Sequence, residues 1–298
     1  MKHITRRDFL KIAGAGTIGL MTNPKFSLAQ TGRRASTVIQ CHDDYATSGS
    51  TVNDTVVQIM TDESIKTLTG ISDVGEAWRS IFPGITDASI IGIKVNAANE
   101  YVATRPEFVD CIINGLTQMQ FGGSSFIRNN IIIYDRDSTE LSDAGYTIYT
   151  GTDPNTVRCF GSSQPGVGFD TTCPLMVEIY PSGTDTKFPS KILSQMIDYL
   201  INIAVLKNHG TAQITLTLKN HYGSVNAPLS NGMHYAYCTP SIPSLNKQIR
   251  YHIDPTEIEK IFIVDALWAS VLYATAGSPS WNPKIILKSL DPVACDYL

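Results

Sequence analysis

Several common cofactor and nucleophile motifs are missing from this sequence of 298 residues. It has no C-x-x-C pair, no G-x-x-x-x-G-K-[ST] phosphate loop and no G-x-S-x-G nucleophile elbow. A glycine run at Gly14 lies within the first thirty residues, and no dinucleotide-binding glycine fingerprint follows it. These absences disfavour a hydrolase with a nucleophile elbow, a P-loop NTPase and hydride transfer with a Rossmann-bound nicotinamide.

The six cysteines are spread widely along the chain. Their spacing excludes a zinc ribbon or a ferredoxin-type iron–sulfur cluster built from neighbouring residues. Cys159 and Cys173 flank a loop rich in glycine and proline. A disulfide between them would close that loop in an oxidising compartment, but spacing alone does not establish that the two sulfur atoms meet.

Long apolar runs are also missing. Beyond the N-terminal segment, no stretch has the ~18 uninterrupted apolar residues that a bilayer-spanning helix needs. We therefore expect no transmembrane segment after signal removal. The remaining apolar content suffices for the core of a single α/β domain over residues 30–298.

The first 29 residues have the composition of an export signal. Arg6 and Arg7 stand in the setting Thr-Arg-Arg-Asp-Phe-Leu-Lys, a Gly/Ala-rich apolar stretch follows over residues 12–21, and Ser27-Leu28-Ala29 is typical of a cleavage site. We predict twin-arginine export, with the twin-arginine translocase as a partner and a periplasmic or extracellular location. Because that route carries folded proteins, it also hints at a cofactor loaded before export.

The charge balance argues against one class of partner. The full chain has a net charge of −4, and residues 1–29 hold five basic residues against one acidic residue, so their removal leaves −8. Nucleic-acid binding depends largely on basic residues that neutralise phosphates. Nucleic acid is therefore not expected as a partner.

Apolar strands and helical patterns alternate along the chain, which predicts an α/β fold with a mixed, mostly parallel sheet flanked by helices. Residues 88–96 and 130–135 are typical of buried strands, and Thr104-Arg-Pro-Glu107 between them has the pattern of a capping box that starts a helix. Strand, helix and strand together indicate a parallel pair with a right-handed crossover.

The second half of the chain continues this pattern after an insertion. Residues 146–188 are rich in glycine, proline, threonine and serine, with short β-like pieces. A helix is predicted from Ser190 to about Leu200, followed by strands at 201–206, 260–265 and 284–287.

Charged and polar side chains stand where four of the predicted strands end. In open α/β sheets, ligands bind outside the carboxyl ends of the strands. Each residue alone is as well explained by a solvated strand end, but their repetition favours a shared site. The residues are Lys94, Asn96, Asp135, Arg136, Lys207, His209 and Asp265.

The stretch LKNHGTAQITLTLKNHYG, residues 206–223, supplies two lysines and two histidines, although the chain has only six histidines. Neutral imidazole ligates zinc, copper, iron or nickel and also serves as an acid or base. Lysine binds a carboxylate or phosphate, or acts covalently once desolvated. His209 and Lys219 are the candidate catalytic residues, and Lys94, Asn96, Arg136, Lys207 and Asn220 the candidate ligand-binding residues.

A divalent metal is a candidate cofactor, whereas no iron–sulfur motif is present. The candidate metal ligands are His209, His221, His234, Asp135 and Asp265. For His221, a hydrogen-bonded turn explains the residue equally well, and His252 is better explained by such a role.

Taken together, these motifs resemble the domain-of-unknown-function 362 (DUF362) family. The resemblance is carried by IGIKVN, the Thr-Arg-Pro-Glu helix start, NIIIYDR, the paired LKNHG and LKNHYG, IVDA and the closing residues 289–296. It implies a bacterial or archaeal protein, often with a twin-arginine signal, whose activity is largely undefined. Iron–sulfur labels given to some relatives do not carry over. Because the family usually continues into a further helix, we expect this chain to be truncated at Leu298.

A second resemblance is narrower. His209, Lys219 and His234 follow one another at spacings similar to the His-Lys-His order of nickel-pincer lactate racemases. There the lysine anchors a pyridinium-derived cofactor, one histidine ligates nickel and another exchanges a substrate proton. This chain lacks the Gly-Gly-Pro surroundings expected before that lysine.

Two functional hypotheses follow. The first is an exported protein with a strand-end pocket for a small anionic molecule, with a metal as cofactor and His209 as the base if a proton is abstracted beside a carboxylate. The second is a non-catalytic binding or interaction module in which the same residues form salt bridges. Convergence of these side chains on one pocket favours the first hypothesis.

Overall fold

The computed structural model of the protein describes residues 25–29, 36–227, 232–253, 258–271 and 278–297. Most of the predicted signal lies outside the described residues. Its last five residues form strand β1 (Lys25–Ala29), which pairs antiparallel with β2 (Val38–His42) at one edge of the main sheet. No helix in these described ranges is long and apolar enough to span a bilayer.

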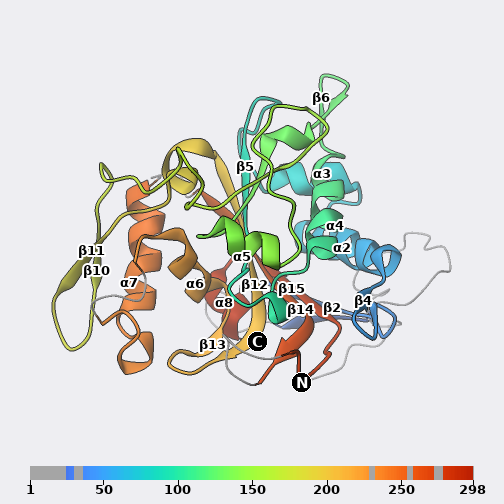
Figure 1. Ribbon diagram of the computed structural model, residues 1–298. Coiled ribbons are helices and arrows are strands. Elements are labelled where there is room, and N and C mark those ends of the chain that lie inside the picture. The colour runs from blue at the N-terminus through green and yellow to red at the C-terminus, as the bar shows by residue number, and fades with distance from the viewer. Residues whose placement is uncertain (1–24, 30–35, 228–231, 254–257, 272–277, 298) are drawn as a thin grey trace.

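A nine-stranded mixed sheet organises the fold, in the order β1-β2-β15-β14-β12-β5-β8-β9, with β13 paired to β12 (Figure 1). The strands from β14 to β9 run parallel, whereas the neighbouring pairs β14–β15 and β15–β2 are antiparallel. The predicted α/β class with a mixed, mostly parallel sheet is thereby confirmed. The strand bounds are β5 (Ile91–Lys94), β8 (Ile131–Tyr134), β9 (Arg158–Cys159), β12 (Tyr199–His209), β13 (Gln213–Thr215), β14 (Glu259–Ser270) and β15 (Ile285–Ser289).

Helices cover both faces of this sheet (Figure 1). On one side lie α2 (Asp54–Thr69), α3 (Val74–Ser80) and α4 (Pro106–Leu116). On the other side lie α6 (Thr217–Asn220), α7 (Ser241–Gln248) and α8 (Pro292–Tyr297). The remaining helical turns are α5 (Ser138–Asp143), η1 (Glu100–Val102), η2 (Arg128–Asn130), η3 (Ile192–Met196), η4 (His221–Ser224), η5 (Ala236–Cys238) and η6 (Ile249–Ile253).

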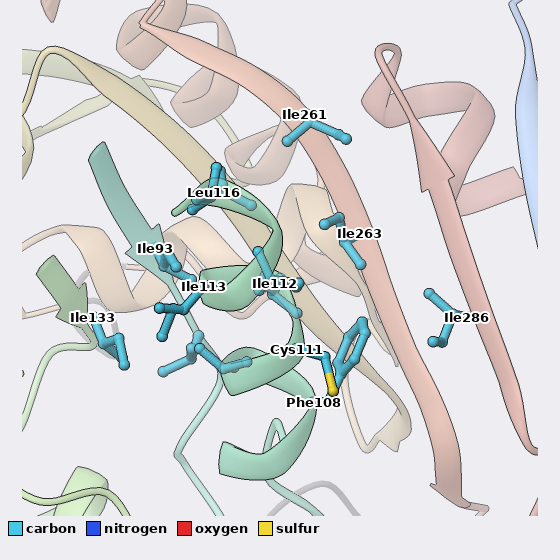
Figure 2. Packing of buried hydrophobic residues seen from close by; sticks show 14 of the residues in the cluster. Ile93, Phe108, Cys111, Ile112, Ile113, Leu116, Ile133, Ile261, Ile263 and Ile286 are labelled. Atoms are coloured by element: carbon cyan, nitrogen blue, oxygen red, sulfur yellow. The ribbon is translucent and has the colours of Figure 1, made fainter. Parts of the chain in front are cut away.

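The strands bury side chains on both faces, as their continuous apolar runs predict. In β8, Ile131 and Ile133 belong to the core beneath α4, whereas Ile132 and Tyr134 belong to the core on the opposite face. Figure 2 shows Phe108 and Ile112 of α4 packed toward this sheet. The alternation has period two, so both core layers depend on the register of the same short strand.

The predicted capping box at the start of α4 does not form. The N-cap is Arg105, whose side chain makes no capping hydrogen bond. Thr104 instead uses its hydroxyl across the sheet: its Oγ1 accepts from the Asn96 backbone N–H at 2.9 Å and donates to the Ile203 carbonyl at 3.3 Å. Asp265 accepts a hydrogen bond from the Arg105 backbone N–H, 2.9 Å away, and so holds the helix start in its place.

Residues 190–200 also differ from the prediction. The expected helix is reduced to the five-residue π turn η3, and β12 already begins at Tyr199. Ile192 and Leu193 are buried in the core, but the chain does not continue as a helix after Met196.

The Gly/Pro-rich segment 146–188 contains β9 and a hairpin of β10 (Leu175–Glu178) with β11 (Thr184–Lys187), in keeping with the predicted β-like pieces. Two further small hairpins pair β3 (Thr47–Ser48) with β4 (Thr51–Val52) and β6 (Gln120–Phe121) with β7 (Ser124–Ser125). All six cysteines are free thiols, so the disulfide considered between Cys159 and Cys173 is not formed.

Candidate functional site

A cavity of about 570 Å³ opens beyond the carboxyl ends of the parallel strands β5, β8 and β12. Its walls also include η1, α5, β13 and α6. The structure brings nine of the eleven predicted site residues to this cavity, from five separate segments of the chain. These nine are Lys94, Asn96, Asp135, Arg136, Lys207, His209, Lys219, Asn220 and His234.

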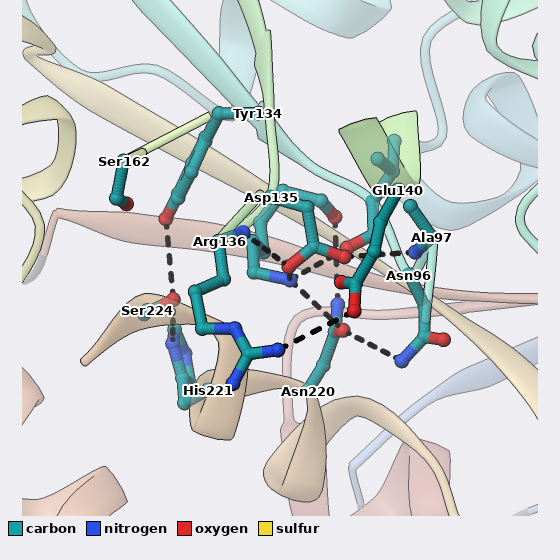
Figure 3. A network of polar contacts seen from close by, with 12 residues as sticks. Asn96, Ala97, Tyr134, Asp135, Arg136, Glu140, Ser162, Asn220, His221 and Ser224 are labelled. Atoms are coloured by element: carbon teal, nitrogen blue, oxygen red, sulfur yellow. Dashed lines mark hydrogen bonds and ion pairs between the residues drawn. The ribbon is translucent and has the colours of Figure 1, made fainter. Parts of the chain in front are cut away.

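A buried ion pair forms one wall. Lys94 Nζ lies 2.6 Å from Asp135 Oδ1, and both side chains are almost fully buried. Asp135 also accepts backbone N–H bonds from Ala97 (2.8 Å) and Arg136 (2.7 Å) (Figure 3). Burial lowers the pKa of Lys94, and the neighbouring Asp135 carboxylate opposes that shift. The carboxylate is thus fully engaged by donors from the protein itself.

Gly223 leaves the room that this pair needs. A Cβ at that position would stand 2.3 Å from Asp135 Oδ1 and 2.7 Å from Lys94 Nζ. Any larger residue there would therefore push the pair apart. The glycine that ends the LKNHYG sequence has this packing role.

Asn220 connects the same wall to β12. Its Oδ1 accepts from Lys94 Nζ (3.2 Å) and from Asn96 Nδ2 (3.1 Å), and its Nδ2 donates to Asn202 Oδ1 (2.8 Å). These contacts use both ends of the amide. Asn220 therefore holds the ion pair and the strand ends in register.

Two predicted site residues do not reach the cavity. His221 is fully buried, with Nε2 2.9 Å from Glu259 Oε1 and Nδ1 3.1 Å from Ser224 Oγ. Asp265 accepts backbone N–H bonds from Arg105 and Leu267, and burial raises its pKa to about 6. Both side chains hold backbone segments together.

The order Ser224, His221, Glu259 resembles that of a hydrolytic triad, yet none of the three lines the cavity. The Ser224 hydroxyl is fully buried and also lies 3.4 Å from the Tyr134 hydroxyl. A nucleophile needs access to a reacting carbon, which this serine does not have. We interpret these three hydrogen-bonded side chains as structural.

The cavity residues do not fit a chelated metal. Within the described ranges, no group of three or more His, Cys, Asp or Glu side chains is placed to hold a metal ion. His209 and His234 stack face to face, with ring centroids 5.4 Å apart and planes 26° apart. The predicted metal set is dispersed because His221 and Asp265 point into the fold and Asp135 is engaged by Lys94.

His209 has an unusual hydrogen-bond arrangement. Its Nδ1 accepts from the backbone N–H groups of Thr211 (3.1 Å) and Ala212 (3.0 Å). Desolvation, followed by the nearby charges of Lys219, His234 and Lys207, lowers its pKa to about 4. The lone pair at Nδ1 is already used, and a proton there would break two hydrogen bonds. These bonds do not suit the predicted role of a general base.

Lys207 and Lys219 differ from the other cations of the cavity. Lys207 is buried and its Nζ donates to the Val102 carbonyl, 3.0 Å away, while Lys219 Nζ lies 4.7 Å from the centroid of the Tyr222 ring. Desolvation lowers the pKa of each lysine to about 8. No carboxylate in the described part of the chain forms an ion pair with either one.

Three acidic side chains also line the cavity. Glu100 comes from η1, and Glu140 and Asp143 come from α5. Arg136 lies 3.3 Å from Glu140, so this predicted anion-binding residue is neutralised at the rim. The cavity is therefore lined both by the ammonium groups of Lys207 and Lys219 and by these carboxylates.

Sequence reasoning missed several lining residues, among them Tyr101, Thr215 and Tyr222. Tyr222 stands within the LKNHYG sequence and makes an edge contact with the His234 ring, 5.0 Å between centroids. In the sequence, only its place three residues after Lys219 indicated that it could belong to the site. Tyr101 and Thr215 lie in short elements whose placement depends on the sheet.

The comparisons with known proteins give a family and no activity. A sequence profile described as "Domain of unknown function (DUF362)" matches residues 91–298. A search of curated proteins gave no match. One similar solved structure is that of a protein from Thermotoga maritima, with a TM-score of 0.39 and 7% identity, covering 84% of this chain. This chain spans 60% of that protein's length.

Proposed function

Because the chain belongs to the DUF362 family, which is defined without an activity, we propose a function from the cavity itself: binding of a small molecule that carries a carboxylate or phosphate. The observation that carries the proposal is the pair Lys207 and Lys219. Lys207 is buried and Lys219 is half-buried, and neither forms an ion pair with a carboxylate in the described part of the chain.

Burying an ammonium group without a counter-charge is costly, and proteins usually pair such a group. Lys94 follows that rule through Asp135. Because Lys207 and Lys219 form no such ion pair, an anionic ligand would supply a close counter-charge and raise their pKa values. At neutral pH both lysines are mostly protonated, since their pKa values are about 8.

The volume and charge of the cavity limit the possible ligands to small molecules with few negative charges. Its volume of about 570 Å³ is in the range of small-molecule sites. The acidic lining residues Glu100, Glu140 and Asp143 would repel a molecule with many negative charges. A monoanion or a compact dianion satisfies both constraints.

Calorimetric titration of the purified protein with glutarate and with inorganic phosphate tests this proposal. Charge-assisted hydrogen bonds contribute about 1.5–3 kcal/mol, so Lys219→Met should weaken binding by roughly tenfold to a hundredfold. Lys247→Met, at an exposed lysine of α7, is the matched control and should bind like the unmodified protein. Equal affinities in Lys219→Met and the unmodified protein, or no binding of either anion, would refute the proposal.

We also propose export by the twin-arginine route, which the Arg6-Arg7 setting supports. Fractionation of cells that express the full chain is the test. Replacing both arginines with lysine should retain the protein in the cytoplasm, and an unchanged distribution would count against export by this route.

A further inference from the structure

The hydrogen bonds of His209 fix which ring nitrogen carries its proton. A backbone N–H group can only donate, so Nδ1, which receives two of them from Thr211 and Ala212, must present its lone pair. A neutral imidazole has one N–H, which is then on Nε2. The tight turn between β12 and β13 supplies both donors, so the fold itself imposes this tautomer.

The surroundings of His209 also keep it neutral. Lys219, His234 and Lys207 are the titratable groups that act on it, and none is a carboxylate that would stabilise an imidazolium ion. The ring stacks on His234, which limits its rotation. Since His209 lines the cavity, the structure presents an uncharged N–H donor there beside two cationic ones.

We propose that the ligand of this cavity is an oxo acid, whose carboxylate binds Lys207 and Lys219 and whose ketone oxygen accepts a hydrogen bond from His209 Nε2–H. The inference rests on the proposed function and adds the class of ligand.

A ketone suits the part of the cavity next to His209 better than a hydroxyl group does. A hydroxyl needs an acceptor for its own hydrogen, whereas ammonium groups only donate, and two of the three groups that act on His209 are lysines. A ketone oxygen only accepts. An uncharged donor also polarises a carbonyl without attracting a second anion, as neutral histidines do in enzymes that enolise ketones.

The same tautomer accounts for the misfit with a metal site. Ligation through Nε2 requires its lone pair, which the proton occupies as long as the two backbone donors hold Nδ1. His209 therefore serves as a donor to the ligand.

The tautomer is tested by nitrogen NMR of protein labelled at histidine, with the His209 signals assigned by their loss in His209→Gln. At pH 7 we expect a proton on Nε2 and none on Nδ1. A proton on Nδ1, or a doubly protonated ring, would overturn the inference.

The ligand class is tested by titrating 2-oxoglutarate against glutarate, which has the same charge and lacks the ketone. The readout is the ratio of the two affinities. We expect the oxo acid to bind about tenfold more tightly, as one added hydrogen bond allows. The ratio should fall to about one in His209→Leu, and His209→Gln, which keeps an N–H group near the Nε2 position, should retain part of it.

The outcomes separate the two proposals. If glutarate or phosphate binds but the oxo acid has no advantage, or the advantage survives in His209→Leu, the inference fails and the anion site stands. If none of the three anions binds, the proposed function fails and the inference with it.

Discussion

Individual residues in this protein show how burial without an ion pair lowers the pKa of a lysine. Lys288 on β15 is fully buried, donates to the Thr61 carbonyl at 2.9 Å and lies 5.2 Å from the Trp78 ring centroid. Desolvation lowers its pKa to about 7. Unlike Lys207 and Lys219, it does not line the candidate site, so we expect its burial to affect stability.

Lys288 predicts a dependence of stability on pH. An unfolded lysine has a pKa of about 10.4, so between about pH 7 and 10 the unfolded chain binds more protons and stability rises with pH. Lys288→Met should raise the free energy of unfolding at pH 7 and remove about 2 kcal/mol of the rise between pH 7 and 9. Urea unfolding at both pH values measures this.

Lys247→Met serves as the control, because that lysine is exposed and should keep the full pH dependence. The same pH dependence in Lys288→Met and the unmodified protein would show that the buried ammonium is not its source.

Secondary-structure elements explain why two identical triplets behave differently. In Leu206-Lys-Asn-His209 the chain is a strand, so Lys207 and His209, two residues apart, share one face and both line the cavity. In the second triplet the chain is helical at α6. Lys219 and Asn220 then line the cavity, while His221 turns into the core.

This difference marks the limit of prediction from the sequence. Strands at β5, β8, β12 and β14 were predictable because short apolar runs end in polar residues. The strand ends in turn brought most of the site residues together. The roles of His221 and Asp265 were not predictable, because a buried histidine paired with Glu259 and a carboxylate that holds a helix start look like ligands in sequence.

The helices were less predictable than the strands. Residues 54–69 form the helix α2, which was not among the elements predicted from the sequence. Its N-cap, Asn53, accepts from the Val56 backbone N–H. At residues 190–200 the opposite happened: a helix was predicted, and only the turn η3 formed. At residues 190–200, the packing of Ile192 and Leu193 in the core outweighed local helix propensity.

At the scale of the whole molecule, the sheet concentrates unpaired positive charge in one place on an acidic protein. The net charge is −4, and the cations Lys94 and Arg136 at the cavity have carboxylate partners. Lys207 and Lys219 come from β12 and α6, which are in contact. An anion that enters the cavity is thus attracted to these two lysines.

A crystal structure of the protein soaked in tungstate tests this central claim most directly, because the heavy oxyanion reports its own position by anomalous scattering. The account predicts tungstate in the cavity, with oxygens within about 3 Å of Lys207 Nζ and Lys219 Nζ. Tungstate bound only at the molecular surface, with both lysines uncontacted, would contradict it.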